Sequence, residues 1–142
     1  MCIRDRAATI RDNQITGGGV AAVLVQGKAT ISDNTFKGIG PKQGNAVWVW
    51  EDSVATVFHN SFTGYRTTVS AKKATISIIN NTVSQFGATA FVVKDSKEPA
   101  HVYGNRATSS DSKAKAVVMT GKSGVIADNK VSTGASPHSE AK

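Results

Sequence analysis

Apolar and polar positions alternate along this chain in short stretches that recur at a nearly constant interval. Residues 29–36, ATISDNTF, show the repeated pattern most clearly: small, x, aliphatic, x, x, Asn, x, apolar. The repeated asparagines are Asn13, Asn34, Asn60, Asn81, Asn105 and Asn129, separated by 21, 26, 21, 24 and 24 residues. An interval of about 20–26 residues is typical of a solenoid, in which each repeat adds one coil.

Two positions of the repeat predict a buried face. The residues three before the asparagine are Ile10, Ile31, Val57, Ile78, Val102 and Ile126. The residues two after it are Ile15, Phe36, Phe62, Val83, Ala107 and Val131. The positions between are mostly Thr, Ser or charged, so the period of two indicates strands with one buried side.

The alternation shifts phase at the asparagine, which predicts a sharp corner between two strands. We expect the asparagine itself to take the left-handed backbone conformation of that corner. Its amide is expected to hydrogen-bond to the equivalent amides of the coils above and below, as in other stacked asparagine ladders. The six asparagines are therefore predicted to form an internal structural ladder.

A second set of strands lies between the asparagine motifs. Its members are predicted over residues 20–25, 46–50, 67–71, 88–93 and 116–119. Each coil then has about three short strands and three corners. The predicted fold is all-β, a parallel solenoid of about six coils.

This repeat resembles that of the right-handed parallel β-helices found in pectate lyases, polygalacturonases, alginate epimerases, NosD-type periplasmic proteins and many secreted adhesins. The resemblance covers residues 7–134 and implies a secreted or periplasmic protein. It says little about activity, because one scaffold serves many chemistries. A leucine-rich repeat has the same spacing around its Asn but needs several leucines per repeat, and Leu24 is the only leucine here.

Length and charge narrow the choices further. The chain of 142 residues fits one domain. Its net charge of +7 comes from scattered lysines, which indicates either a solvated surface or a partner such as an acidic polysaccharide. No pattern of a nucleic-acid-binding motif accompanies the charge, so nucleic acid is not expected. No apolar run approaches the ~18 residues of a membrane span, and Cys2, the only cysteine, excludes an internal disulfide.

The two ends depart from the repeat. Residues 1–6, MCIRDR, fit neither a strand nor a signal peptide and are predicted to be a non-native leader of adapter origin. The β-helix domain is predicted over residues 7–134, and residues 135–142 as a disordered tail. Such a leader predicts that the native chain begins further upstream, so that the first coil here is an open strand edge. Self-association is expected through this open end or through outward apolar strips.

Outward aromatic residues are the first candidates for ligand binding. In residues 47–50, VWVW, the alternation places both valines inside and both Trp48 and Trp50 outside. These tryptophans are either covered by another segment or partner, or form a platform for the C–H faces of sugar rings. Phe58, Ile79 and Tyr103 share an outward position and predict a second apolar strip, with Phe58 and Tyr103 as weaker ligand-binding candidates.

One column of the repeat combines acids and a histidine. The residues immediately before the ladder asparagines are Asp12, Asp33, His59, Asn80, Gly104 and Asp128. Asp12, Asp33 and His59 would lie about 5 Å apart in successive coils, close enough for acid–base catalysis or for a shared divalent cation. The alternative is that these residues cap the corner by hydrogen-bonding to nearby backbone N–H groups.

The resemblance supplies no catalytic motif. The Asp-Pro-His of alginate epimerases, the Arg-x-Pro of pectate lyases and the Asp-Asp with Gly-His-Gly of polygalacturonases are all missing from the sequence. We therefore expect no cofactor and no metal, with the cation near Asp12 and Asp33 as an open alternative. The chain is predicted to be a carbohydrate-associated β-helix segment with a binding or structural role and no catalytic activity of its own. A segment of a polysaccharide lyase, hydrolase or epimerase and an adhesin shaft remain alternatives.

Overall fold

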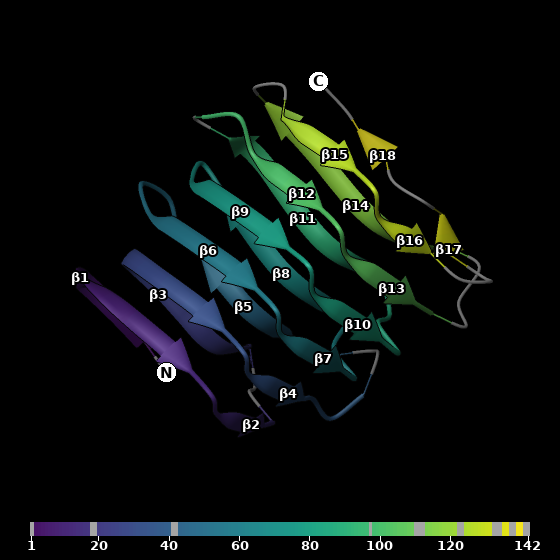
Figure 1. Ribbon diagram of the computed structural model, residues 1–142, viewed down its shortest axis with the longest axis horizontal. Coiled ribbons are helices and arrows are strands. Elements are labelled where there is room, and N and C mark those ends of the chain that lie inside the picture. Colours follow the sequence, from purple (N-terminus) through teal and green to yellow (C-terminus); the bar gives the residue numbers. More distant parts are fainter. Residues whose placement is uncertain are drawn as a thin grey trace.

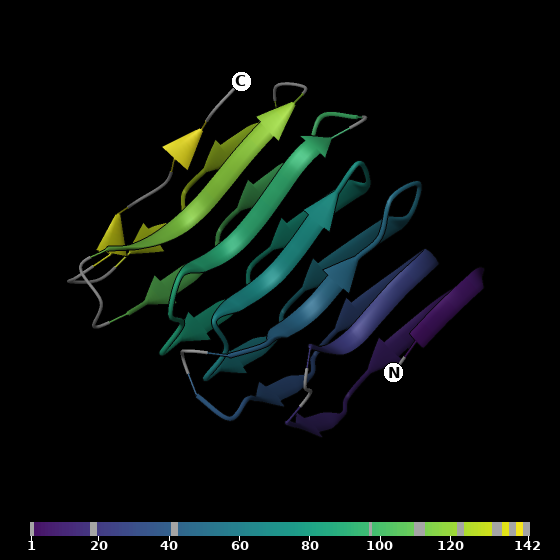
Figure 2. The ribbon, with the colours of Figure 1, turned by 180° about the vertical axis from the view of Figure 1, so that it is seen from behind.

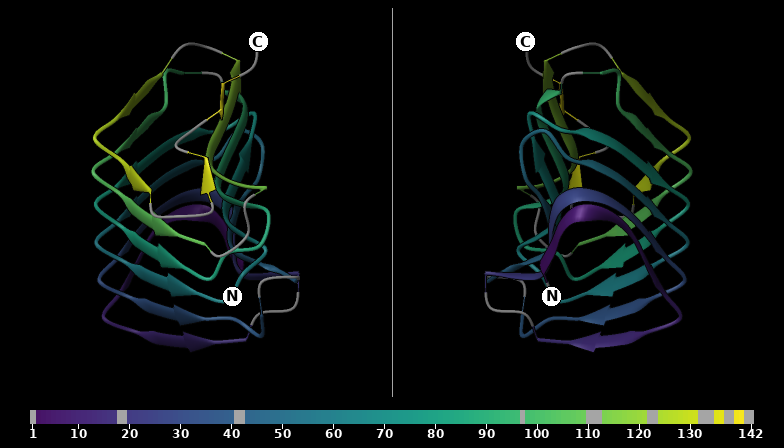
Figure 3. Two further views of the ribbon diagram at one scale, coloured as in Figure 1. Left: turned by 90° about the vertical axis from the view of Figure 1, so that its right-hand side faces the viewer. Right: turned by 90° about the vertical axis from the view of Figure 1, so that its left-hand side faces the viewer.

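The computed structural model describes residues 2–17, 20–40, 43–96, 98–109, 113–121, 124–131, 135–136 and 139–140. All strand pairs in this part of the chain are parallel, and they form a 12-stranded and a 6-stranded sheet. The chain winds about five turns around a common interior (Figures 1 and 3). The predicted parallel solenoid is confirmed. Its smaller sheet is a stack of six short strands.

The coils have three faces. The first face, seen from outside in Figure 2, contains β5 (Asn45–Val49), β8 (Thr67–Lys72), β11 (Thr89–Ser96) and β14 (Ala114–Gly121). The second face contains β6 (Val54–Phe58), β9 (Thr75–Ile79), β12 (His101–Tyr103) and β15 (Val125–Ala127). The third face contains β2 (Gln14–Thr16), β4 (Thr35–Lys37), β7 (Ser61–Thr63), β10 (Thr82–Ser84), β13 (Arg106–Thr108) and β16 (Lys130–Val131).

Two long strands at the N-terminal end belong to two faces at once. β3 (Ala21–Ser32) pairs with β5 through its first half and with β6 through its second half. β1 (Cys2–Arg11) follows β3 around the same bend. The first and second faces are therefore one continuous sheet, whereas the third face is separate.

The buried columns predicted from the repeat are present. Ile10, Ile31, Val57, Ile78 and Val102 stack in register on the second face and are at most 5% exposed. On the third face, Phe36 and Phe62 stack with ring centroids 4.7 Å apart. Each coil thus buries its apolar side chains against those of its neighbours, which is the source of solenoid stability.

The asparagine ladder is also present and runs in one direction. The Nδ2 of each of the first five asparagines donates to the Oδ1 of the next, at 3.0–3.2 Å. The backbone N–H of the same residue donates to that same Oδ1 at 2.8–3.1 Å. From Asn34 onward, Nδ2 also donates to a backbone carbonyl of the preceding coil at 2.9–3.0 Å. The amides of Asn34, Asn60, Asn81 and Asn105 are therefore satisfied although these residues are at most 3% exposed.

The left-handed residue at the corner is the one before the asparagine, so that part of the prediction was wrong. Asp12, Asp33, His59, Asn80 and Asp128 have φ of 53–58°, and Gly104 has φ of 68°. The ladder asparagines are not among the described residues with positive φ. The preceding residue makes the turn, which leaves the asparagine side chain directed inward to the ladder.

Both ends extend the sheet further than the sequence predicted. Cys2, Ile3 and Arg4, expected to lie outside the fold, pair with Leu24, Val25 and Gln26 of β3. Within the expected disordered tail, β17 (Ala135–Ser136) and β18 (Ser139–Glu140) pair with β14. The reason is that a strand edge offers free backbone N–H and C=O groups to any adjacent segment, whatever its side chains. The non-native origin of residues 1–6 stays a prediction.

Tyr65 connects three coils at the corner between the third and first faces. Its ring is 2% exposed, and its hydroxyl donates to the carbonyl of Gly17 at 3.1 Å. A Cβ at Gly38 would collide with the carbonyl of Gly64 and touch the Tyr65 ring, so only glycine fits there. Burial raises the pKa of Tyr65 to about 12.

The ladder predicts a position-dependent cost for removing an amide. Replacing Asn60 by Leu leaves the N–H of Asn34 and the carbonyl of Ile31 without their partner in the interior. We expect the free energy of unfolding to fall by about 2–4 kcal/mol. The matched control is Asn13→Leu at the exposed first rung, which should cost less than about 1 kcal/mol. Urea titrations measure both values, and equal costs would contradict the buried ladder.

The burial of Tyr65 predicts a loss of stability at alkaline pH. The unfolded chain releases the tyrosine proton near pH 10, whereas the folded chain keeps it until its pKa of about 12. Rising pH therefore favours unfolding between these values, by about 1–3 kcal/mol in total. In Tyr65→Phe this component of the decline should be missing, although the variant starts lower because it lacks the bond to Gly17. Denaturation at pH 9–12 tests the difference in slope.

Candidate functional site

The acid and histidine column lies at the corner between the second and third faces. Every residue of this column turns the chain with a positive φ. Asp, Asn and His are the non-glycine residues that tolerate this conformation best. The backbone requirement therefore accounts for the composition of the column without the capping hydrogen bonds that the sequence suggested as the alternative to catalysis.

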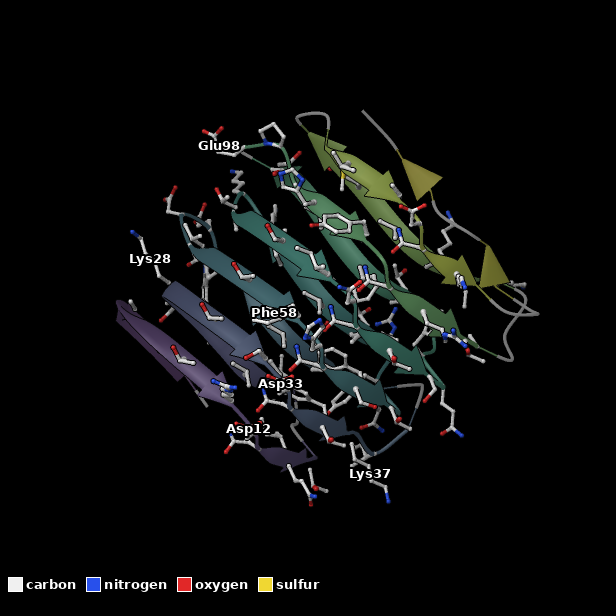
Figure 4. All side chains as sticks on the ribbon, viewed as in Figure 1. Asp12, Lys28, Asp33, Lys37, Phe58 and Glu98 are labelled. Atoms are coloured by element: carbon white, nitrogen blue, oxygen red, sulfur yellow. The ribbon has the colours of Figure 1, made fainter. Side chains whose placement is uncertain are left out.

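Three successive coils bring charged groups together at the N-terminal end of this column. Asp12 and Asp33 lie one above the other at the corner (Figure 4). The Nε of Arg11 is 3.2 Å from a carboxylate oxygen of Asp12 and 3.7 Å from one of Asp33. The Nδ1 of His59 is 3.9 Å from the other oxygen of Asp33, beyond hydrogen-bond range, and its ring meets that of Phe58 edge-on at 5.2 Å.

This arrangement argues against a cation between the two carboxylates. Arg11 already supplies positive charge to both, so a divalent ion would have to displace it or bear its repulsion. Among the described residues, no three His, Cys, Asp or Glu side chains are grouped closely enough to hold a metal ion. All three candidate residues are substantially exposed, with side-chain exposures of 39% for Asp33, 54% for His59 and 70% for Asp12. Their surroundings are therefore closer to water than to a desolvated catalytic site.

A shallow groove runs beside this column. It has a volume of about 370 Å³ and is lined by Asp33, Asn34, Thr35, His59, Asn60, Ser61, Asn80 and Thr82. Thr35, Ser61 and Thr82 are the outward residues of β4, β7 and β10 nearest the corner, and their register stacks them in one column. We call this the corner groove. The sequence analysis did not single out these hydroxyl residues, although their repeat position, one after each ladder asparagine, was readable.

The tryptophans lie elsewhere, at the corner between the first and second faces. As predicted, the valines at 47 and 49 are fully buried and Trp50 is exposed, at 43%, whereas Trp48 is half-buried. The indoles of Trp48 and Trp50 are parallel, 2° apart in plane and 5.8 Å apart between centroids. They line a groove of about 260 Å³ together with Val49, Glu51, Lys72 and Lys73, which we call the tryptophan groove.

The lysines of the tryptophan groove were missed as site residues because they appeared scattered in the sequence. β5 pairs with β8 so that Val49 lies opposite Ala71, and Trp50 is therefore followed by Lys72 in the next coil. Lys72 pairs in turn with Lys94 of β11. Residues 22 positions apart in the chain thus become neighbours on one surface.

The second predicted strip is also present. Phe58, Ile79 and Tyr103 stack in register along the second face, and Tyr103 is 37% exposed. The strip is adjacent to the corner column, because each of its members directly precedes a column residue. The structure thus separates the candidates: Phe58, Asp33 and His59 meet at one corner, whereas Trp48 and Trp50 form their own groove at another.

The corner conformation predicts how position 59 responds to substitution. A β-branched residue is strained at a φ of 55°, whereas glycine is not. His59→Val should therefore lower the free energy of unfolding by about 1–2 kcal/mol, and His59→Gly should leave it within about 0.5 kcal/mol. Thermal and urea denaturation provide the comparison. If Gly costs as much as Val, side-chain contacts of His59 rather than its backbone determine this position.

Comparison with known proteins supports the fold and indicates no specific function. No curated protein and no solved structure matches the chain. In the described part of the chain there is no helix that could span a membrane. The family model described as the right handed beta helix region matches residues 1–132, and the chain therefore belongs to the right-handed β-helix family.

Proposed function

We propose that this protein is a carbohydrate-binding β-helix segment, exported from the cytoplasm, that holds acidic polysaccharide through the tryptophan groove. The observation that carries the proposal is the pair of parallel indoles, Trp48 and Trp50, beside Lys72 and Lys73. Flat aromatic surfaces suit the apolar faces of sugar rings. The ammonium groups suit the carboxylates or sulfates of an acidic glycan.

The arrangement of the groove favours an extended chain over a single sugar. Trp50, Lys72 and Lys94 follow one another in adjacent coils, about 4.8 Å apart along the solenoid axis. A linear polyanion lying along the axis would meet an aromatic ring and then two ammonium groups. Glu51 also lines the groove, so the attraction is weaker than the lysines alone would give.

Binding is favoured over catalysis by the surroundings of the acidic residues. Asp33 and His59 lie at a different corner from the tryptophans, and their exposure leaves them without the desolvation that strengthens catalytic electrostatics. An adhesin shaft is the second candidate, favoured by the partly exposed strip of Phe58, Ile79 and Tyr103. A shaft would associate with other protein through this strip and ignore sugars.

The tryptophan groove predicts a defined loss of glycan binding. The double variant Trp48→Ala, Trp50→Ala should bind polygalacturonate about 5- to 150-fold more weakly, because two stacking contacts of about 0.5–1.5 kcal/mol each are lost. Lys72→Gln should weaken binding less and reduce its dependence on salt. The matched control is Lys28→Gln on β3, which removes an exposed lysine outside the groove.

Affinity electrophoresis and calorimetry at two salt concentrations measure these effects, with circular dichroism to confirm the fold. Polygalacturonate and heparin serve as probes. Binding that is unaffected by the tryptophan variants would contradict the proposal. Release of reducing ends or unsaturated products, abolished by Asp33→Asn, would instead establish a catalytic role for Asp12, Asp33 and His59.

A further inference from the structure

The corner groove has a composition that the tryptophan groove does not share. The described residues that line it include no lysine or arginine, and their polar groups are hydroxyls, amides, one carboxylate and one imidazole. Lys28 and Lys37 lie at the outer edges of the second and third faces, away from Asp33 (Figure 4). The nearby guanidinium of Arg11 is paired with Asp12 and Asp33. An acidic ligand would therefore meet the carboxylate of Asp33 without a free cation in the groove.

The polar groups of the groove are of the kind that sugar hydroxyls require. Hydroxyls donate and accept, the Asn80 amide does both, and the Asp33 carboxylate accepts. Thr35, Ser61 and Thr82 are exposed and repeat at the coil spacing of about 4.8 Å, so they present one row of hydroxyls along the axis. Asn80 points along the same axis, because the missing side chain of Gly104 leaves room for its amide oxygen.

An apolar strip lies next to the groove, on the far side of the corner column, although none of its residues lines the groove. Phe58 directly precedes His59 and packs against its ring, and Ile79 and Tyr103 continue the strip beside the corner. A sugar ring has one surface of C–H groups and an edge of hydroxyls. The hydroxyl row offers partners to the hydroxyl edge, and the strip beyond the corner column offers an apolar surface to the C–H groups of a ring that extends across the corner.

We infer that the corner groove is a second carbohydrate site, and that it takes a linear neutral glycan lying along the solenoid axis. The site is separate from the tryptophan groove, on the opposite edge of the second face, and the inference does not depend on acidic glycan binding there. Arg106 follows Thr82 in the column and marks the end of the uncharged stretch. A protein with both sites would hold an acidic glycan at one edge of the second face and a neutral glycan at the other.

The test compares two outward columns of the same sheet. Thr35→Val with Thr82→Val removes two hydroxyls of the corner groove while keeping β-branched side chains on exposed positions. The matched control, Thr16→Val with Thr108→Val, makes the same change at two exposed threonines of the other outward column of this sheet, which lies at the far ends of its strands. Melting temperatures confirm that both variants fold.

Cellohexaose, laminarihexaose and mannohexaose are the probes, titrated into the full chain by NMR and calorimetry. We expect at least one to bind saturably, with amide shifts centred on Ser61 and Thr82. The groove variant should bind it about tenfold more weakly, from the loss of two hydrogen bonds, and the control should be unchanged.

Three results would overturn the inference: no saturable binding of any of the three probes, equal loss in the control variant, or loss in Trp48→Ala, Trp50→Ala. The last result would show that neutral and acidic glycans share the tryptophan groove. Failure of the proposed function has a different outcome, since polygalacturonate binding would then be missing while neutral binding at Ser61 and Thr82 persists.

Discussion

The asparagine ladder is the constraint on which the rest of this structure depends. A buried amide is costly unless all its hydrogen bonds are made. Here each interior Oδ1 accepts from the backbone and the side chain of the preceding asparagine, while each Nδ2 donates to the coil before and the coil after. These bonds form only when successive coils lie in one register. Because every bond between two ladder asparagines runs from the donor of one coil to the Oδ1 of the next, the ladder also gives the stack a direction.

The ladder in turn determines the chemistry of the corner. For the asparagine to point inward, the residue before it must turn the chain with positive φ. That requirement selects Asp, Asn, His and Gly, and two of these, Asp and His, are also residues used in acid–base and metal chemistry. A column that resembles a catalytic cluster therefore arises from backbone geometry alone. In a solenoid, the function of such a column has to be judged from its exposure and neighbours, and Arg11 beside Asp12 and Asp33 indicates an ion-paired surface.

The side chains that this scaffold presents to its surroundings lie in outward columns, since the inward ones are committed to packing. Parallel stacking converts a residue repeated every 21 to 26 positions into a row about 4.8 Å apart. The two grooves show how different such rows can be. One places parallel tryptophans before lysines, and the other places hydroxyls beside an apolar strip. Both are lined by residues of successive coils and so present their groups at a regular spacing.

The sequence by itself determined the parallel solenoid, the ladder and the inward or outward direction of most side chains, because these follow from a short repeat in which every copy obeys the same burial pattern. Ile31, Val57 and Ile78 could be placed inside, and Trp48 and Trp50 outside, from alternation alone.

Tertiary structure decided what alternation along one strand cannot predict. It assigned the left-handed conformation to the residue before each asparagine, extended the sheet at both ends through backbone pairing, and joined Trp50 to Lys72 and Lys94. The physical reason is that burial is a local property repeated in every coil. Which residues become neighbours across coils depends instead on the length of each intervening loop, and the register is fixed only once the coils are stacked.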